Sequence, residues 1–443
     1  MTALTIDQLV DTRRFGSFHL RILVLCLLMQ FVDGFDMRSI SLVAPQLVKH
    51  WHVPREAFGP VFGAAATGVM LATLVAGPLG DRVGRKLLMA GSLLIAAVLM
   101  IATAFVHSIP ALIALRFLCG LPLGALVPMT VVLASEWSPA RHRAVMVLTM
   151  CGGYSLGSVL SPLMVSGLSH AFGWRAVFYA GGGASVLLAA LVAALLPESL
   201  RFLGLRNTPE RKARIAQILQ RFAPDAAIAE AAIWPSPERT GGWRAVPALF
   251  RDHRARVTLL AWSCLFLAMI AETFLVSWLP TLLGDVVSAD RALWLTSLFP
   301  LGGIAATLLL GGVSDRFGPW RMLAVLFALS VPIIALIGFA GSMLPVLIAA
   351  VALAGFCVIG GHHLMTVQAA TLYPTTMRAT GTSWVVAVGR AGSILGPVIG
   401  GVLIGRHLPA QVMFPAMAVF AAAACGVALL LGAASRNRPA TDM

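Results

Sequence analysis

Two carboxylates and a guanidinium interrupt a long apolar stretch near the start of the chain. FVDGFDMRSI places Asp33, Asp36 and Arg38 inside HLRILVLCLLMQFVDGFDMRSISLVAP, which is long and apolar enough to cross a bilayer. Residues three apart share a helix face, so the two carboxylates are expected one turn apart, with Arg38 roughly opposite Asp36. Burial favours the protonated form of a carboxylic acid, and a nearby second carboxylate adds to this. The pair is therefore predicted to carry a proton across the membrane; the alternative is a structural acid paired with an arginine.

The second half of the chain contains complementary charges. Arg390 lies in the middle of another apolar segment, and a guanidinium can hold a carboxylate through two hydrogen bonds. We therefore expect Arg390 to bind the carboxylate of an organic anion; the alternative is a buried salt bridge to Asp33, Asp36 or Glu272. Glu272, in AETFLVSWLP, is expected to be a second protonation site or the counter-ion of Arg390.

Further polar and aromatic residues are candidates for substrate binding. Arg116 and Arg38 are placed to attract anions at the outer mouth, although snorkelling explains Arg38 equally well. His362 and His363 point about 100° apart on a helix, so they cannot chelate one metal ion. They are candidates for a proton relay or for a hydrogen bond to a phenolic substrate, against a packing role. Five aromatic residues are candidates to stack on a planar ring or to pack in the core: Trp262, Phe266, Phe274, Trp278 and Trp384.

The elements that must position these residues are membrane helices. The 443 residues are 59% hydrophobic and 11% charged, with a mean hydropathy of +0.89, which indicates lipid as the solvent. The first nineteen residues lack the apolar core of a signal peptide. About twelve segments satisfy the length of a spanning helix: 20–45, 57–80, 87–106, 110–135, 144–167, 174–196, 257–283, 291–312, 322–341, 344–371, 380–404 and 411–434.

The distribution of charge orients these segments. The net charge is +14, but most basic residues fall in loops on one side of the predicted topology. This bias predicts that both termini are cytoplasmic and makes a nucleic-acid partner unexpected. The six cysteines lie within apolar segments without CxxC spacing, so no disulfide framework or metal site is expected. The opposite loops carry about five basic residues: Lys49, Arg55, Arg175, Arg291 and Arg406.

The chain divides into two related halves, 1–196 and 257–443, joined by a polar connector, 197–256. GPLGDRVGRK is repeated as GGVSDRFGPWR, SPARHRA as YPTTMRA, and GSVLSP as GSILGP, at a shared offset of about 235 residues. Duplicated halves are typical of secondary transporters, whose substrate site lies between the repeats. Within the connector a short basic helix is expected at 209–222.

These motifs carry a family resemblance. GPLGDRVGRK resembles the loop between helices two and three of the major facilitator superfamily. DGFD, PESLRFL and YPTTMRATGTSWVVAVGRAGSILGPVIGG look like the aromatic acid:proton symporter family within it. The resemblance implies an all-α integral membrane protein with 12 transmembrane helices in two pseudo-symmetric six-helix halves. It also implies that a cytoplasmic charge network latches the inner gate, through Asp81, Arg82, Arg85, Lys86, Glu136, Arg143, Asp315 and Arg316.

The predicted function is proton-coupled uptake of an aromatic carboxylate across the inner membrane by a monomer, with protons as the coupling ion and no cofactor. A proton-driven efflux antiporter is the nearest alternative, but SPLMVSG in helix five lacks the GPxxGG motif of antiporters. PESLRFL suggests a sugar or dicarboxylate symporter, although amide side chains are scarce in the helices. A membrane sensor would be expected to carry a signalling domain, and an enzyme would need a nucleophile–base or metal constellation.

Overall fold

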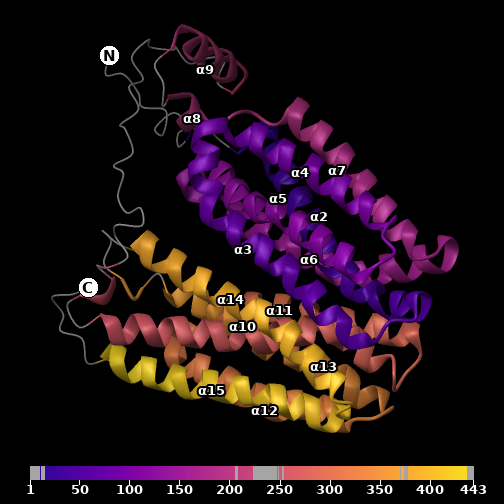
Figure 1. The fold of residues 1–443 in the computed structure, drawn as a ribbon. Helices are drawn as coiled ribbons and strands as arrows, with labels where there is room; N and C mark the ends of the chain where they lie inside the picture. The colour runs from indigo at the N-terminus through magenta and orange to yellow at the C-terminus, as the bar shows by residue number, and fades with distance from the viewer. Residues whose placement is uncertain are drawn as a thin grey trace.

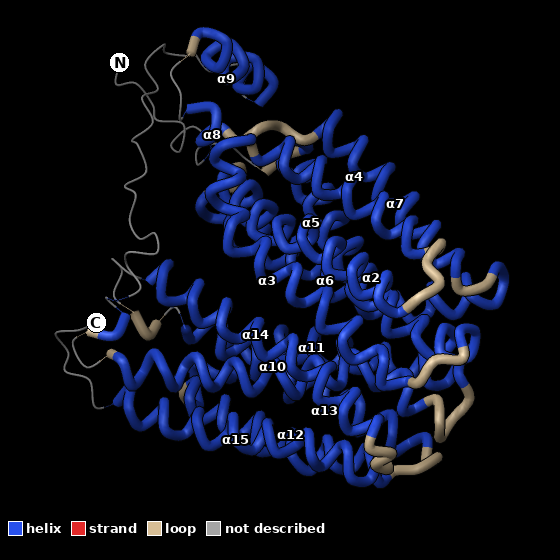
Figure 2. Tube along the Cα trace, in the orientation of Figure 1, coloured by secondary structure: helices blue, strands red, loops and turns tan. Residues whose placement is uncertain are grey.

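The computed structural model describes residues 10, 15–204, 208–222, 247, 249–251, 254–369, 371–373 and 378–436. None of these residues lies in a strand, and most lie in long helices (Figure 2). The first group of helices is α2 Ser17–Trp51, η1 Arg55–Ala57, α3 Phe58–Val83, α4 Arg85–Thr103, α5 Ile109–Glu136, α6 Ala140–Phe172, α7 Arg175–Leu195, α8 Leu200–Gly204 and α9 Pro209–Phe222. The second group is α10 Ala255–Leu283, α11 Ala289–Phe317, α12 Pro319–Phe339, α13 Leu344–Ala369, α14 Arg378–Gly405 and α15 Ala410–Arg436.

Twelve of the described helices are long and apolar enough to cross a membrane, which confirms the predicted fold class. They match the predicted segments one for one, but several extend further. The helix α2, for example, continues to Trp51, beyond the predicted end at 45. An apolar run measures only the hydrocarbon thickness, whereas a helix can continue into the polar interface. The basic connector helix is present as α9, at Pro209–Phe222.

The twelve spanning helices form two bundles with the same internal pairing. In the first bundle α2 packs on α6, α3 on α5 and α4 on α7; in the second, α10 packs on α14, α11 on α13 and α12 on α15. Figure 1 shows the bundles diverging toward the end where α8 and α9 lie and meeting at the opposite end. We call these the diverging end and the joined end. The equivalent pairings reproduce the repeat seen in the sequence.

Glycines allow equivalent helices to approach closely in both bundles. A Cβ atom on Gly157 of α6 would collide with the backbone of Phe31 in α2. A Cβ atom on Gly392 of α14 would collide with the backbone of Phe266 in α10. These two glycines are related by the 235-residue offset, so the duplicated GS motif has a packing role in both copies.

Polar contacts connect the two bundles at the joined end. The Arg55 guanidinium lies 2.6 Å from the Asp285 carboxylate. The Ser166 hydroxyl donates to Asp290 over 3.0 Å, and His170 Nε2 lies 3.5 Å from the same carboxylate. We call these five residues the latch. Because its members come from both bundles, the latch favours the conformation in which this end is closed.

Candidate functional site

The two aspartates of α2 have different surroundings, and Asp36 is enclosed within the first bundle. Its Oδ1 lies 3.4 Å from Arg116 Nη1 of α5, and the Cys119 thiol donates to its Oδ2 over 3.3 Å. The Asp36 and Arg116 side chains are only 3% and 1% exposed. Arg116 also donates to Thr103 over 2.7 Å and lies 5.8 Å from the centroid of the Phe178 ring. The charge of Arg116, predicted to attract anions at the outer mouth, is matched here by Asp36.

Asp33 lies within electrostatic reach of the second bundle as well as of its own helix. Its carboxylate is repelled by Asp36 and attracted by Arg390 of α14, and it lies near Tyr154 of α6. Asp33 itself is buried, whereas Tyr154 is 39% exposed. Gly34 makes this arrangement possible, because a Cβ atom there would collide with the Tyr154 backbone. Asp33 therefore belongs to the interface between the bundles.

Arg38 makes a second charged connection between the bundles. Its Nη1 donates to the Val276 carbonyl of α10 over 3.1 Å, and its charge is attracted by Glu272 on the same helix. Two electrostatic attractions therefore cross the interface, between Arg38 and Glu272 and between Asp33 and Arg390. Each bundle contributes one carboxylate and one guanidinium. We call these four residues the central charges.

Two histidines of α13 extend this polar region in the second bundle. His362 Nδ1 lies 2.9 Å from Glu272 Oε2, and His363 Nδ1 lies 2.9 Å from the Thr307 hydroxyl of α11. The Thr307 hydroxyl donates its single proton to the Gly303 carbonyl, so His363 is the donor in the contact with Thr307. The two rings thus have different partners, as their separation on the helix predicts.

Arg390 retains hydrogen-bonding capacity. Its Nε is buried and donates to none of the described residues. A buried donor without a partner costs about 1–3 kcal/mol, and a charged donor more. A carboxylate ligand would satisfy this donor by making a bidentate contact with the guanidinium. This is the arrangement expected for an anion-binding arginine.

The three tryptophans predicted to stack on a substrate ring or to pack in the core all have partners. Trp278 is 1% exposed, donates from Nε1 to the Pro397 carbonyl over 2.9 Å, and packs edge-on against Phe62 of the first bundle at 5.3 Å. It therefore contributes to the contact between the bundles. Trp384 stacks on Trp262, with ring centroids 5.8 Å apart and an angle of 23° between the planes.

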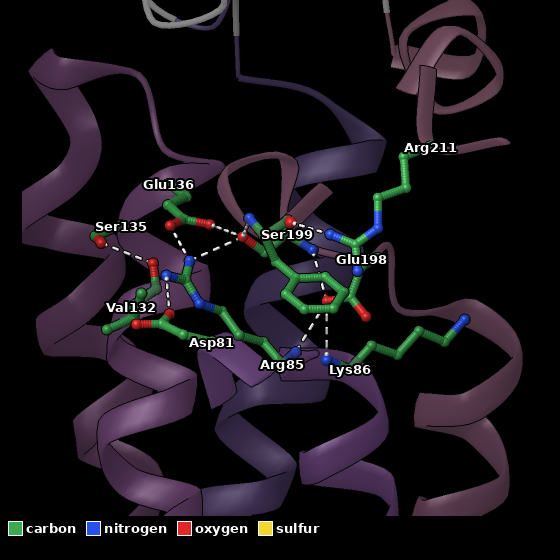
Figure 3. Close-up of polar contacts among 10 residues, drawn as sticks. Asp81, Arg85, Lys86, Val132, Ser135, Glu136, Glu198, Ser199 and Arg211 are labelled. Carbon is green, nitrogen blue, oxygen red and sulfur yellow. Dashed lines mark hydrogen bonds and ion pairs between the residues drawn. The ribbon is translucent and has the colours of Figure 1, made fainter. Parts of the chain in front are cut away.

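The predicted gating residues of the first half form one network at the diverging end (Figure 3). The Arg85 guanidinium pairs with Asp81 at 3.6 Å and with Glu136, and it donates to Ser199 over 2.8 Å. Ser199 in turn donates to Glu136 over 2.6 Å. In this conformation these contacts join α3, α4, α5 and the segment before α8, all within the first bundle.

The sequence PESLRFL explains how α4 begins. Glu198 Oε1 accepts hydrogen bonds from the backbone nitrogens of Arg85 and Lys86, at 3.0 and 3.1 Å. It thereby satisfies two of the amide groups that a helix start leaves unpaired. Gly84, with φ of +104°, is the single residue between α3 and α4, and a Cβ atom there would lie 2.8 Å from Glu198 Oε2. Glu198 and Ser199 were not predicted as site residues, although they belong to the PESLRFL motif on which the family resemblance partly rests.

The remaining predicted gating residues have less defined surroundings. Arg82 and Arg143 are exposed at the diverging end. Asp315 and Arg316 lie in α11, but their side chains are outside the described part of the structure. The gating role of the whole set stays a prediction.

Comparison with known proteins identifies the family. The model of the Major Facilitator Superfamily matches residues 26–293 and 261–442, which is nearly the whole chain. The chain belongs to the major facilitator superfamily. It is therefore a multi-pass membrane protein of a family of transporters.

Two relatives illustrate where in this superfamily the chain falls. The 4-hydroxybenzoate transporter PcaK of Acinetobacter baylyi is 36% identical, over 99% of this chain and 96% of the relative. The gallate transporter of Pseudomonas putida is 34% identical, over 97% of this chain and 95% of the relative. These identities confirm the resemblance to aromatic acid transporters of the superfamily.

Solved structures support the fold alone. A bacterial homologue of the human lysosomal transporter Spinster, inward-facing and unoccupied, superimposes with a TM-score of 0.72 at 16% identity, covering 95% of this chain and 98% of the other. The nucleoside transporter NupG superimposes with a TM-score of 0.71 at 13% identity, covering 94% of this chain and all of the other.

Proposed function

We propose that this member of the superfamily imports an aromatic carboxylate together with a proton across the cytoplasmic membrane, by alternating access. The substrate class is supported by the relatives, which are named transporters of 4-hydroxybenzoate and gallate. Both molecules join a carboxylate to a hydroxylated ring. The arrangement of the central charges supports the coupling to a proton.

The observation that carries the proposal is the balance of the central charges. Asp33 and Glu272 offset Arg38 and Arg390, so the empty site with both acids ionised is neutral. A substrate anion alone would leave the site at −1, and a proton alone would leave it at +1. An uncompensated buried charge is costly, so the site favours either both ligands or neither. This preference is the physical basis of symport.

Each central residue then has a role. Arg390 binds the substrate carboxylate through its guanidinium, whose Nε is unsatisfied, and Asp33, no longer attracted by a free Arg390, takes the proton. Tyr154 and His363 lie beside the charges and are available to the substrate ring and its hydroxyl groups. Glu272 is held by His362 and offsets Arg38, so it is the second candidate for protonation. One proton per monoanion makes the loaded step electroneutral.

The orientation follows from the distribution of basic residues. With both termini in the cytoplasm, the diverging end opens to the cytoplasm and this conformation is inward-open. Import then requires the latch and the Arg38–Val276 contact to break as the bundles rock outward. Both halves of the site come from one chain, so a monomer suffices.

Uptake into proteoliposomes tests the proposal. Purified protein is reconstituted, a pH gradient acid outside is imposed, and labelled 4-hydroxybenzoate is followed with and without a protonophore. We expect accumulation that the protonophore abolishes. We also expect benzoate and gallate to compete, whereas 4-hydroxybenzyl alcohol, which keeps the phenol but lacks the carboxylate, does not. Accumulation that ignores the protonophore would exclude proton coupling, and equal competition by the alcohol would exclude the carboxylate contact.

A further inference from the structure

A recess lies outside the central site, on the flank of the first bundle near the diverging end. It encloses about 830 Å³ between the first turns of α2 and α4, the last turn of α7, and α9. Three cations from three different helices line it, Arg21, Lys86 and Arg214. In Figure 3 the Lys86 side chain extends away from the Arg85 network. None of these cations belongs to the central charges.

The recess carries an excess of positive charge. Lys86 is attracted by Glu198 and, more weakly, repelled by Arg214. Glu198 is the one carboxylate among the described residues that line the recess, and its Oε1 already accepts hydrogen bonds from the backbone of Arg85, Lys86 and Ser199. Three cations with one carboxylate leave a net charge of about +2. An anion with several oxygens would relieve this repulsion.

The floor of the recess is apolar and continues onto the surface that faces lipid. Leu87 and Leu195 line the recess and are 62% and 45% exposed. Exposed apolar residues continue along the same helices, with Leu94 on α4 and Leu191 on α7. An apolar surface of this kind would stabilise a bound acyl chain, whereas it would contribute nothing to the binding of a small soluble anion.

The fourth wall is a basic amphipathic helix. Ile215 and Ile218 of α9 pack against the apolar core of the first bundle, while Arg214 faces the recess. Basic amphipathic helices bind at membrane surfaces, and each Lys or Arg near an anionic leaflet adds to that affinity. Figure 1 shows α9 at the diverging end, which faces the cytoplasmic leaflet in the proposed orientation.

We propose that this recess binds an anionic diacyl phospholipid of the cytoplasmic leaflet. The phosphate lies among Arg21, Lys86 and Arg214, and an acyl chain lies over Leu87 and Leu195. The bound lipid connects the connector helix α9 to α2, the helix that carries Asp33. The site requires the cytoplasmic orientation of the diverging end but is independent of the substrate.

Native mass spectrometry of the full-length protein in detergent tests the proposal. Phosphatidylglycerol and phosphatidylcholine are added separately, because they share a phosphate and acyl chains but differ in net charge. We expect phosphatidylglycerol to remain bound and phosphatidylcholine to bind at least ten-fold more weakly. Each of Arg21→Gln, Lys86→Gln and Arg214→Gln should weaken phosphatidylglycerol binding about five-fold, the equivalent of ~1 kcal/mol per basic residue.

Two further variants keep the test specific. Arg256→Gln removes an exposed cation from the first turn of α10, the equivalent helix of the other bundle, and should leave binding unchanged. Ala194→Phe fills the apolar floor without changing charge, and it should weaken phosphatidylglycerol at least five-fold.

Three results would overturn the proposal. The first is equal retention of the two lipids, and the second is an equal loss of binding in Arg256→Gln. The third is displacement of phosphatidylglycerol by millimolar glycerol 3-phosphate with no effect of Ala194→Phe, which would identify a soluble phosphate as the occupant. The three single variants and Ala194→Phe all change exposed or half-exposed positions, and a thermal unfolding scan of each confirms that folded protein is compared.

Discussion

The sharpest prediction separates the two aspartates of α2, which look equivalent in the sequence. Replacing Asp36 by Asn leaves the guanidinium of Arg116, 1% exposed, with the Thr103 hydroxyl and the Phe178 ring as its remaining described contacts. Removing one partner of a buried ion pair costs about 3–5 kcal/mol, because the other charge is left uncompensated. Asp36→Asn should therefore destabilise the first bundle by about this amount.

Asp33→Asn should behave differently. Asp33 is attracted by Arg390 across the interface, and Arg390 is only partly buried, unlike Arg116, so water at its guanidinium can compensate for the lost carboxylate. We expect Asp33→Asn to unfold at nearly the wild-type temperature while losing proton-driven accumulation. The double variant Asp36→Asn/Arg116→Gln removes both members of the buried pair and should recover much of the stability lost in the single variant.

The assay is thermal unfolding of the purified variants in one detergent, together with the amount of folded protein in the membrane. The expected order of unfolding temperature is wild type, Asp33→Asn, the double variant and then Asp36→Asn. Equal destabilisation by Asp33→Asn and Asp36→Asn would refute the assignment of different environments. No recovery in the double variant would refute the view that Asp36 and Arg116 stabilise each other.

Three other predictions concern transport and conformation. Asp33→Asn should reduce gradient-driven accumulation more than ten-fold while retaining exchange of internal for external substrate, measured in the same proteoliposomes; loss of both activities would argue for a general defect. Arg390→Lys should raise the KM for 4-hydroxybenzoate about ten-fold or more, because an ammonium cannot make the two-toothed contact, and an unchanged KM would remove Arg390 from the substrate site. Arg55→Ala should shift the conformational equilibrium toward the outward-open state about two- to five-fold, which is the effect expected from the loss of one exposed ion pair. The shift is measured as an increased rate of labelling of a cysteine that replaces Phe62. A Phe62→Cys background without Arg55→Ala is the control, and equal labelling would show that the latch has no effect.

The fold could be predicted because membrane helices have a strong signal. Length and hydropathy predicted all twelve spanning helices, and the repeat at 235 residues predicted that the two halves share one packing plan. The connections could not be predicted as well. The expected loop after GPLGDRV is reduced to Gly84 alone, since Glu198, more than a hundred residues later, caps the next helix. A cap supplied from so far along the chain leaves no pattern in the sequence around the start of the helix.

The four central charges were all named from the sequence as candidates, but the sequence did not predict which of them lie near one another. A spacing of three residues separates two side chains by about 60° on a helix, which is enough to turn Asp36 toward α5 and Asp33 toward α14. Glu272 was expected to be a second protonation site or the counter-ion of Arg390; in the structure it contacts His362 and lies within electrostatic reach of Arg38. Sequence periodicity places a residue on a face of its own helix, but the neighbour of that face depends on how the two bundles meet.

The crossing of the central charges constrains how such a molecule can change. Because Asp33 and Arg38 on one helix face Arg390 and Glu272 on two others, a sign change on either bundle leaves two uncompensated charges in the membrane. A matching change on the other bundle is needed to restore neutrality. A hybrid that joins the first half of one family member to the second half of another should therefore transport only where the charges of the two halves are complementary.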